Sequence, residues 1–404
     1  KFKNSRKQVI VVNQFLTEAQ ALQEEMAENR RYLHANAETG FDLPKTVAFI
    51  TEKLKSYGYT PVQLGGGVVC TCGVPGKTLM IRADMDALPQ QEESGLDFAC
   101  KDGACHSCGH DAHVTMLLGA AKILKQHESE LKGTVKFLFQ PAEELLSGAK
   151  SMIKAGALEN PKVDAAMGIH INFGPDDPTY QVGTLCYGAE KFCASGDAFE
   201  ITVTGKSAHG STPHVGINAL SAAANIVVAL QQFFTLQVPA DEPSIMSICS
   251  FHSGVASNIV PDKAVLQGSI RTYTRDNRMF LLKQLEEISS KTAELWNAKA
   301  DVNFFISTGP NMNNRELTEE MSSYCREILD DVRVIPPQTF SEDFAYYGEH
   351  VPTFFGMLYA GGPSLGHNYS LHDPHATLEE SAMPYGSAAF CQCALRWLEN
   401  HAND

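Results

Sequence analysis

Nine consecutive residues, Cys105–His113, bring together two thiols, three imidazoles and one carboxylate. They directly precede an apolar run, residues 114–124, whose pattern predicts a helix. Cysteine thiolate and neutral imidazole suit zinc and its first-row neighbours, and Gly109 allows Cys108 and His110 to turn toward one point. We therefore predict a metal site. A redox Cys-x-x-Cys pair and a solvated helix start are the alternatives.

Further carboxylates and an imidazole stand where predicted strands end. Strand-like runs at residues 78–81, 134–139 and 164–169 are followed by Asp84 and Asp86, by Glu143 and Glu144, and by His170. Strands that alternate with helices indicate an α/β fold with a mostly parallel sheet covered by helices. Ligands of such sheets gather beyond the carboxyl ends of the strands. We therefore expect these groups, far apart in sequence, to meet in space.

A loop rich in glycine and histidine, residues 361–375, follows the predicted strand 353–360. Its histidines, His367, His372 and His375, are expected to reach the same edge of the sheet. Of these three we select His367 as the metal ligand.

The predicted ligands are more than one tetrahedral ion takes: Cys108, His110, Glu144, His170 and His367. Two metals about 3.5 Å apart, sharing a bridging ligand and a water, are therefore expected. Glu143 and Glu144 are adjacent, so their side chains diverge, and one can bind metal while the other accepts a proton. Such a site activates water, polarises a carbonyl and stabilises an oxyanion, which is the chemistry of hydrolysis.

The central part of the chain has the pattern of a separate two-layer α+β unit. Alternating runs predict strands, and helical patterns lie between them, at residues 198–204, 219–234, 244–251, 263–272, 279–296 and 301–307. About 120 residues is a normal domain size. We therefore predict an inserted domain at residues 186–308, which divides a catalytic domain into residues 1–185 and 309–404.

Composition narrows the functional class. The 47 acidic and 32 basic residues give a formal charge of −15 without a long run of either sign, which argues against nucleic-acid and anionic-membrane partners. Eleven scattered cysteines, an odd number, fit reduced thiols in the cytoplasm better than a disulfide framework. The apolar run at residues 9–12 is too short for a signal peptide, and no stretch is expected to span a membrane.

Several motifs carry a family resemblance: Arg82–Pro89 (RADMDALP), Cys108–Asp111 (CGHD), Phe139–Glu144 (FQPAEE), Gly168–His170 (GIH), Gly205–His209 (GKSAH), Asn258–Asp262 (NIVPD) and Ser341–Phe344 (SEDF). In this order they resemble the amidohydrolase branch of the M20 metallopeptidase family. That branch includes hippurate hydrolases, N-acyl-amino-acid deacylases and plant auxin-conjugate hydrolases. The resemblance implies a two-metal catalytic domain interrupted by a lid, residues 186–308, that also forms a homodimer.

The resemblance also implies roles for single residues. Cys108 becomes the bridging ligand, and Glu143 the general base that later protonates the leaving amine. Asp86 is similar to a carboxylate that orients a metal-binding histidine. In the lid, His209 matches a histidine that crosses to the partner's active site and stabilises the oxyanion. Asn258 and Arg271 match positions that recognise the substrate carboxylate.

The sequence thus predicts a cytoplasmic metal-dependent amidohydrolase that cleaves the amide bond of N-acyl or aminoacyl amino acids. A metal-activated water is the nucleophile, and the two divalent ions are Zn, Mn, Co or Ni. The alternatives are a dipeptidase or aminopeptidase of the same family, a thiol oxidoreductase and a non-catalytic peptide-binding protein. The oxidoreductase leaves Glu143, Glu144, His170 and His367 unexplained.

Overall fold

The computed structural model describes residues 14–174 and 179–403, and the chain forms two units. Unit 1 comprises the chain up to Glu190, Asn313–Pro336 and the chain from Tyr346 onward. Unit 2 comprises Lys191–Met312 and Pro337–Ala345. The short apolar run at residues 9–12 lies outside the described residues.

Unit 1 is built on an eight-stranded sheet with the order β1-β2-β4-β3-β5-β16-β6-β15. The strands are β1 (Val62–Leu64), β2 (Gly67–Gly73), β3 (Thr78–Asp84), β4 (Thr134–Gln140), β5 (Ala165–Asn172), β6 (Leu185–Tyr187), β15 (Val332–Val334) and β16 (Thr353–Tyr359). The four central strands, β4, β3, β5 and β16, run parallel. Every residue of β3, β4 and β16 is buried, as expected for strands covered on both faces. The predicted mostly parallel sheet is confirmed.

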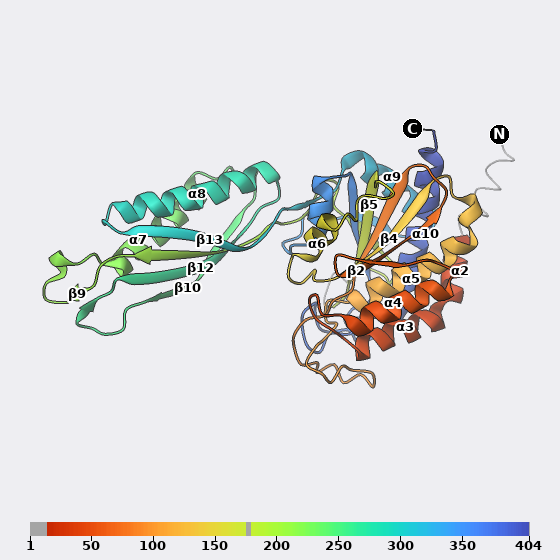
Figure 1. The fold of residues 1–404 in the computed structure, drawn as a ribbon, viewed down its shortest axis with the longest axis horizontal. Coiled ribbons are helices and arrows are strands. Elements are labelled where there is room, and N and C mark those ends of the chain that lie inside the picture. The colour runs from red at the N-terminus through yellow and green to blue at the C-terminus, as the bar shows by residue number, and fades with distance from the viewer. Residues whose placement is uncertain (1–13, 175–178, 404) are drawn as a thin grey trace. The chain divides into compact units, whose positions relative to one another are not determined.

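The helices of unit 1 cover this sheet (Figure 1). They are α2 (Gln14–Ala21), α3 (Gln23–Ala35), α4 (Pro44–Ser56), α5 (His110–Gln126), α6 (Gly148–Lys154), α9 (Arg315–Cys325) and α10 (Met383–Asn400). Helix α5 packs against β3, β4 and β5 on one side and against α3 and α10 on the other. Because it is enclosed in this way, nearly all of its residues are buried. The helix that carries the predicted ligands is therefore the central helix of the unit.

Unit 2 has a separate antiparallel sheet with the order β10-β12-β8-β13, and helices α7 and α8 pack on it. Its elements are β7 (Lys191–Cys193), β8 (Gly196–Thr204), β9 (Ala208–His209), α7 (Ala219–Leu236), β10 (Ile245–Ser253), β11 (Ile259–Val260), β12 (Lys263–Arg271), α8 (Arg275–Glu294), β13 (Lys299–Thr308) and β14 (Asn311–Met312). The alternating burial along β8 places its apolar side chains, such as Phe199 and Ile201, in one core with both helices. The predicted two-layer α+β domain is confirmed.

Helix α7 corrects one expectation from the sequence. It is long and apolar enough to span a membrane by length and composition, whereas no such stretch was expected. One face of the helix, including Ala222, Ile226 and Leu230, is buried in the core of unit 2. A core helix of a soluble protein meets the same criteria, so this single helix is weak support for a membrane partner.

Candidate metal centre

The predicted ligands Cys108 and His110 flank the turn that opens α5. Gly109 has a φ of 82°, in the left-handed region, and a Cβ atom there would lie 2.4 Å from Ile171 Cγ2. Only glycine fits this position without strain. The turn buries both neighbours, since Cys108 is 7% exposed and His110 is fully buried. The expected role of Gly109 is therefore explained by both its backbone angle and its close packing on β5.

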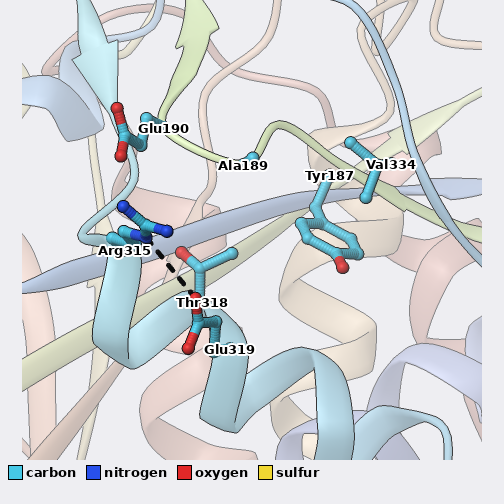
Figure 2. Close-up of a pocket in the computed structure, with 7 residues that line it drawn as sticks. All are labelled: Tyr187, Ala189, Glu190, Arg315, Thr318, Glu319 and Val334. Atoms are coloured by element: carbon cyan, nitrogen blue, oxygen red, sulfur yellow. Dashed lines mark ion pairs between the residues drawn. The ribbon is translucent and has the colours of Figure 1, made fainter.

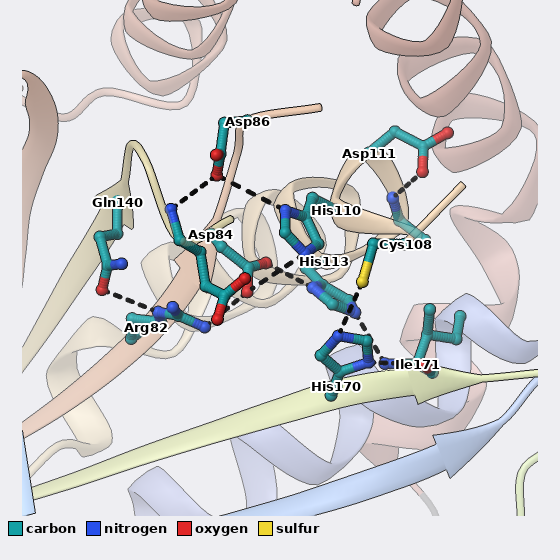
Figure 3. A network of polar contacts seen from close by, with 12 residues as sticks. Arg82, Asp84, Asp86, Cys108, His110, Asp111, His113, Gln140, His170 and Ile171 are labelled. Carbon is teal, nitrogen blue, oxygen red and sulfur yellow. Dashed lines mark hydrogen bonds and ion pairs between the residues drawn. The ribbon is translucent and has the colours of Figure 1, made fainter. Parts of the chain in front are cut away.

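Two groups of potential ligands share the Cys108 thiol. In the first, Cys108 Sγ lies 3.5 Å from His170 Nε2, with His110 close by. In the second, His372 Nε2 lies 3.3 Å from Cys108 Sγ and 3.4 Å from Glu144 Oε1. The side chains of Cys108, His110 and His170 converge from α5 and β5 in Figure 3. The thiol is therefore placed where a ligand could be shared between two ions.

The spacing of these atoms fits metal coordination. Ligands about 2.0–2.3 Å from a tetrahedral ion lie roughly 3.3–3.8 Å from one another. The separations above fall in this range, whereas the 3.9 Å between His110 Nε2 and Glu144 Oε1 lies slightly beyond it. Both ring nitrogens of His110 and Glu144 Oε1 are buried without a hydrogen-bond partner. Buried polar atoms normally have partners, so these donor atoms fit a site that holds cations.

His170 has the tautomer of a metal ligand. Its Nδ1 lies 2.6 Å from the backbone oxygen of Ile171, so Nδ1 carries the hydrogen and donates it. The lone pair of Nε2 is then directed at the Cys108 thiol. Burial, together with nearby His113, holds the pKa of His170 well below its usual value, so the ring is neutral. A neutral ring oriented by a backbone hydrogen bond is typical of metal-binding histidines.

The electrostatic field at the cluster favours positive charge. Burial alone would lower the pKa of His110, but the carboxylates of Asp84, Asp86 and Glu144 raise it to about 10. Burial also raises the pKa of Glu144, to about 7. The pKa of Cys108 is raised well above its usual value by burial and by neighbouring carboxylates. A divalent cation would reverse these last two shifts, because it stabilises thiolate and carboxylate.

Asp86 connects the two glutamates to His110. Its oxygens accept the backbone N–H groups of Glu143 and Glu144, at 3.0 and 3.3 Å. Asp86 Oδ1 also lies 3.6 Å from His110 Nδ1, as Figure 3 shows. One fully buried carboxylate thus positions both the loop after β4 and the ring at the start of α5. Glu143, 6% exposed, lies within this cluster beside Glu144 and His110.

The structure does not bring the predicted ligand His367 to the cluster. His367 Nδ1 bonds Thr377 Oγ1 at 2.9 Å, and Nε2 lies 3.9 Å from Glu379, in neither ligand group. His372 takes its place. Its backbone N–H donates to Ser107 O at 3.0 Å, and its φ of 69° turns the side chain toward Cys108. A contact between distant chain segments, and not the order of histidines in the loop, brings His372 to the cluster.

Asp84, in the motif Arg82–Pro89, and His113, at the end of the cluster Cys105–His113, received no role from the sequence but connect three elements of the site. Asp84 accepts a short hydrogen bond from His113 Nδ1 and pairs with Arg82 at 2.6 Å. His113 Nε2 accepts the Ile171 N–H at 2.7 Å. Both ring nitrogens of His113 are thus occupied, which excludes it as a ligand and makes it a link between β3, α5 and β5. Its position one helical turn after His110 was the available signal.

The residues predicted to act from the inserted domain lie in two separate places of unit 2. His209, on β9, is exposed and pairs with Ile259 next to Asn258, whose backbone oxygen accepts the Gly210 N–H. Arg271 stands at the far end of β12, eight residues after its start, a distance of roughly 27 Å along the strand. The structure therefore brings His209 and Asn258 together and keeps Arg271 apart from both within one unit.

A pocket of about 400 Å³ lies elsewhere in unit 1 (Figure 2). Its lining consists of Tyr187, Ala189, Glu190, Arg315, Thr318, Glu319 and Val334. None of the predicted site residues lines it, and Arg315 is paired with Glu319 at 3.5 Å. The ligand cluster, and not this pocket, is therefore the candidate active site.

Comparisons with known proteins agree with this geometry. The model of Peptidase family M20/M25/M40 matches residues 80–396. The chain is 34% identical to "IAA-amino acid hydrolase ILR1-like 2" of Arabidopsis thaliana, over 94% of this chain and 86% of that protein. It is 32% identical to "N-acetyl-L-cysteine deacetylase" of Bacillus subtilis, over 94% and 90%.

Among solved structures, the YXEP protein of Bacillus subtilis, described as a dinuclear metal binding peptidase from the M20 family, has a TM-score of 0.80 and 30% identity. The similarity covers 94% of this chain and 99% of that one. Ligand cluster, fold and sequence similarity lead to one conclusion: the chain belongs to the M20 peptidase family, in its amidohydrolase branch, and is a metal-dependent hydrolase.

Proposed function

We propose that this hydrolase cleaves the amide bond between an acyl group and an amino acid. The observation that carries the proposal is a thiol, Cys108, shared by two ligand groups, with a second glutamate, Glu143, beside them. The relatives named as an amino acid conjugate hydrolase and as a deacetylase of an N-acetyl amino acid support the same substrate class.

Five residues would hold two divalent ions: Cys108, His110, Glu144, His170 and His372. Thiolate, imidazole and carboxylate together suit Zn, Mn, Co and Ni. Bound metals of this kind lower the pKa of a coordinated water and polarise a substrate carbonyl. The separations between donor atoms and the unpartnered nitrogens of His110 support this assignment.

Glu143 is proposed as the general base and, later, as the acid toward the leaving nitrogen. Its backbone is fixed by Asp86, while the neighbouring Glu144 directs its carboxylate at His372. The two glutamates therefore have separate tasks, as adjacent residues with diverging side chains allow. A carboxylate in this place can take a proton from water and deliver it to nitrogen within one buried site.

In unit 2, Arg271 is proposed to bind the substrate carboxylate. Asn258 and His209, which lie apart from Arg271 within one unit, are proposed to act at the partner's active site, where Asn258 would contact the same carboxylate and His209 would stabilise the oxyanion. The half-buried guanidinium of Arg271 donates to Ser195 O and to Ser341 Oγ, both of which are neutral. The nearby Asp197 is held by Arg278 through two hydrogen bonds. Arg271 thus keeps a charge that a substrate carboxylate can neutralise.

The predicted lid, residues 186–308, is also proposed to form a homodimer. Large apolar side chains are exposed on unit 2, on α7 (Leu220, Val228 and Leu236) and on the edge strand β10 (Ile245 and Phe251). Exposed apolar side chains of this kind are the surface that an interface would cover. Light scattering should give a mass near twice the 44.1 kDa of one chain, and a mass of one chain would contradict the dimer.

Amine release from a panel of N-acetyl, N-benzoyl and N-aminoacyl amino acids tests the proposed reaction. The protein is reconstituted with Zn²⁺ or Mn²⁺, and Glu143→Ala serves as the control. We expect release from N-acyl amino acids that disappears in the control. A strict requirement for a free α-amino group would favour a dipeptidase or aminopeptidase, and no release with two metals bound would favour a peptide-binding protein. The cytoplasmic location stays a prediction.

A further inference from the structure

A second buried ionic network lies beside the first turn of α5 and contains none of the proposed ligands. At its centre is His34, on α3, which is 1% exposed. His34 Nδ1 lies 2.8 Å from Asp111 Oδ2, and Nε2 lies 2.9 Å from Glu92 Oε1. A carboxylate only accepts hydrogen bonds, so both nitrogens donate and the ring is positively charged. Burial alone lowers the pKa of His34, but the hydrogen bonds to both carboxylates outweigh it and raise this pKa.

One end of the network fixes the start of α5. Asp111 is fully buried, and its Oδ2 also forms an ion pair with Arg30 Nε at 3.0 Å. Its Oδ1 accepts the backbone N–H of Ala112 at 2.9 Å. Arg30 continues to Glu380 at 3.0 Å. Because Asp111 directly follows His110, these bonds hold the backbone that carries this proposed ligand.

The other end of the network fixes the loop of His372. Glu92 is 7% exposed, and its Oε2 accepts the backbone N–H of Cys100 at 2.7 Å. The next residue, Glu93, donates its N–H to the backbone oxygen of Pro374 at 2.8 Å. Pro374 is two residues beyond His372. The segment that Glu92 anchors therefore holds the loop that brings His372 to the cluster.

We propose that His34 is a positioning residue for the metal centre, because its ring joins Asp111 to Glu92 and so sets the distance between His110 and His372. This inference rests on the proposed metal centre. His34 touches none of the proposed ligands. It acts through two carboxylates. Asp111 directly follows His110, and Glu92 directly precedes Glu93, whose backbone N–H bonds the loop of His372.

The chain offers a matched control at the other end of α5. His127 also bonds two carboxylates, with Nδ1 2.7 Å from Glu130 and Nε2 3.0 Å from Glu18. Neither carboxylate belongs to a segment that carries a proposed ligand. A purely structural role for His34 predicts that His34→Gln and His127→Gln have similar consequences. A positioning role predicts that only His34→Gln alters metal binding.

The experiment titrates metal-free full-length protein with Co²⁺ and follows its visible absorption, which depends on ligand type and geometry. Competition with a chelator gives the affinity, and thermal unfolding of the metal-free proteins is measured in parallel. We expect His34→Gln to weaken Co²⁺ binding about 10- to 100-fold and to change the spectrum. His127→Gln should bind within about twofold of wild type even where it lowers the unfolding temperature.

Wild-type affinity in His34→Gln, or an equal loss in His127→Gln, would overturn the proposal. If His34→Gln does not fold, Glu92→Gln decides, because it keeps the side-chain shape and removes the charge that His34 meets. About tenfold weaker Co²⁺ binding supports the proposal, and unchanged binding contradicts it. No substrate is used, so an inactive wild type that binds two Co²⁺ ions would contradict the proposed reaction and leave this comparison valid.

Discussion

Replacing Glu143 with alanine should lower turnover by about three orders of magnitude while the protein keeps both metals. The expected size is that of a lost general base. Metal content should not change, because the closest donor pairs join Cys108 to His170 and His372, and Glu144 to His372. Glu143 shares a possible ligand group with His110 and Glu144, so the metal analysis tests this assignment directly. Steady-state kinetics on the best substrate of the panel, together with metal analysis of the purified variant, measure the two effects.

The matched variant is Glu144→Ala. In the wild type, Glu144 Oε1 lies 3.4 Å from His372 Nε2 and is buried without a hydrogen-bond partner. We expect this variant to lose metal as well as activity. The opposite pattern, with metal lost from Glu143→Ala and kept by Glu144→Ala, would mean that the two glutamates have exchanged roles.

Replacing His372 with alanine should reduce metal occupancy and lower activity more than 100-fold, whereas His367→Ala should do neither to that extent. The two histidines differ in their distance from the proposed ligands. His372 Nε2 lies 3.3 Å from the Cys108 thiol, whereas His367 is bonded to Thr377. Loss of a direct ligand should exceed the 10- to 100-fold effect typical of residues that only support ligands. Metal analysis and kinetics of both variants provide the measurement.

These two variants also test whether the metal ligand is His367, as the sequence predicted, or His372, as the structure favours. Both histidines belong to the same loop, so a general disturbance of the loop would affect them similarly. Full metal content in His372→Ala together with metal loss in His367→Ala would restore the sequence-based choice. The unfolding temperature of each metal-free variant controls for damage to the fold.

Local sequence patterns were enough to predict much of the fold. Largely apolar runs predicted the buried strands β3, β4 and β16, because strands covered on both faces bury nearly every side chain. The short strands β1, β6 and β15 were not predicted, since three residues are too few to show a period.

Sequence patterns also predicted that most residues of the candidate site lie close together. Cys108 and His110 are neighbours across a glycine turn, so their proximity is local. Glu144 and His170 reach them because β4 and β5 run parallel to β3 and place their carboxyl ends at one edge. His170 lies inside β5 and not after it, and its direction toward the site follows from the alternation of side chains along a strand.

By itself, then, the sequence predicted a metal-dependent hydrolase, the parallel sheet and the candidate ligands that lie on or beside regular elements. Only the tertiary structure placed His372, and not His367, in the cluster, and only it linked His34 to the segments of His110 and His372. The physical reason is the same in both cases. Regular elements follow from a period that neighbouring residues set, whereas the course of a loop depends on single long-range hydrogen bonds, such as that from the His372 N–H to Ser107.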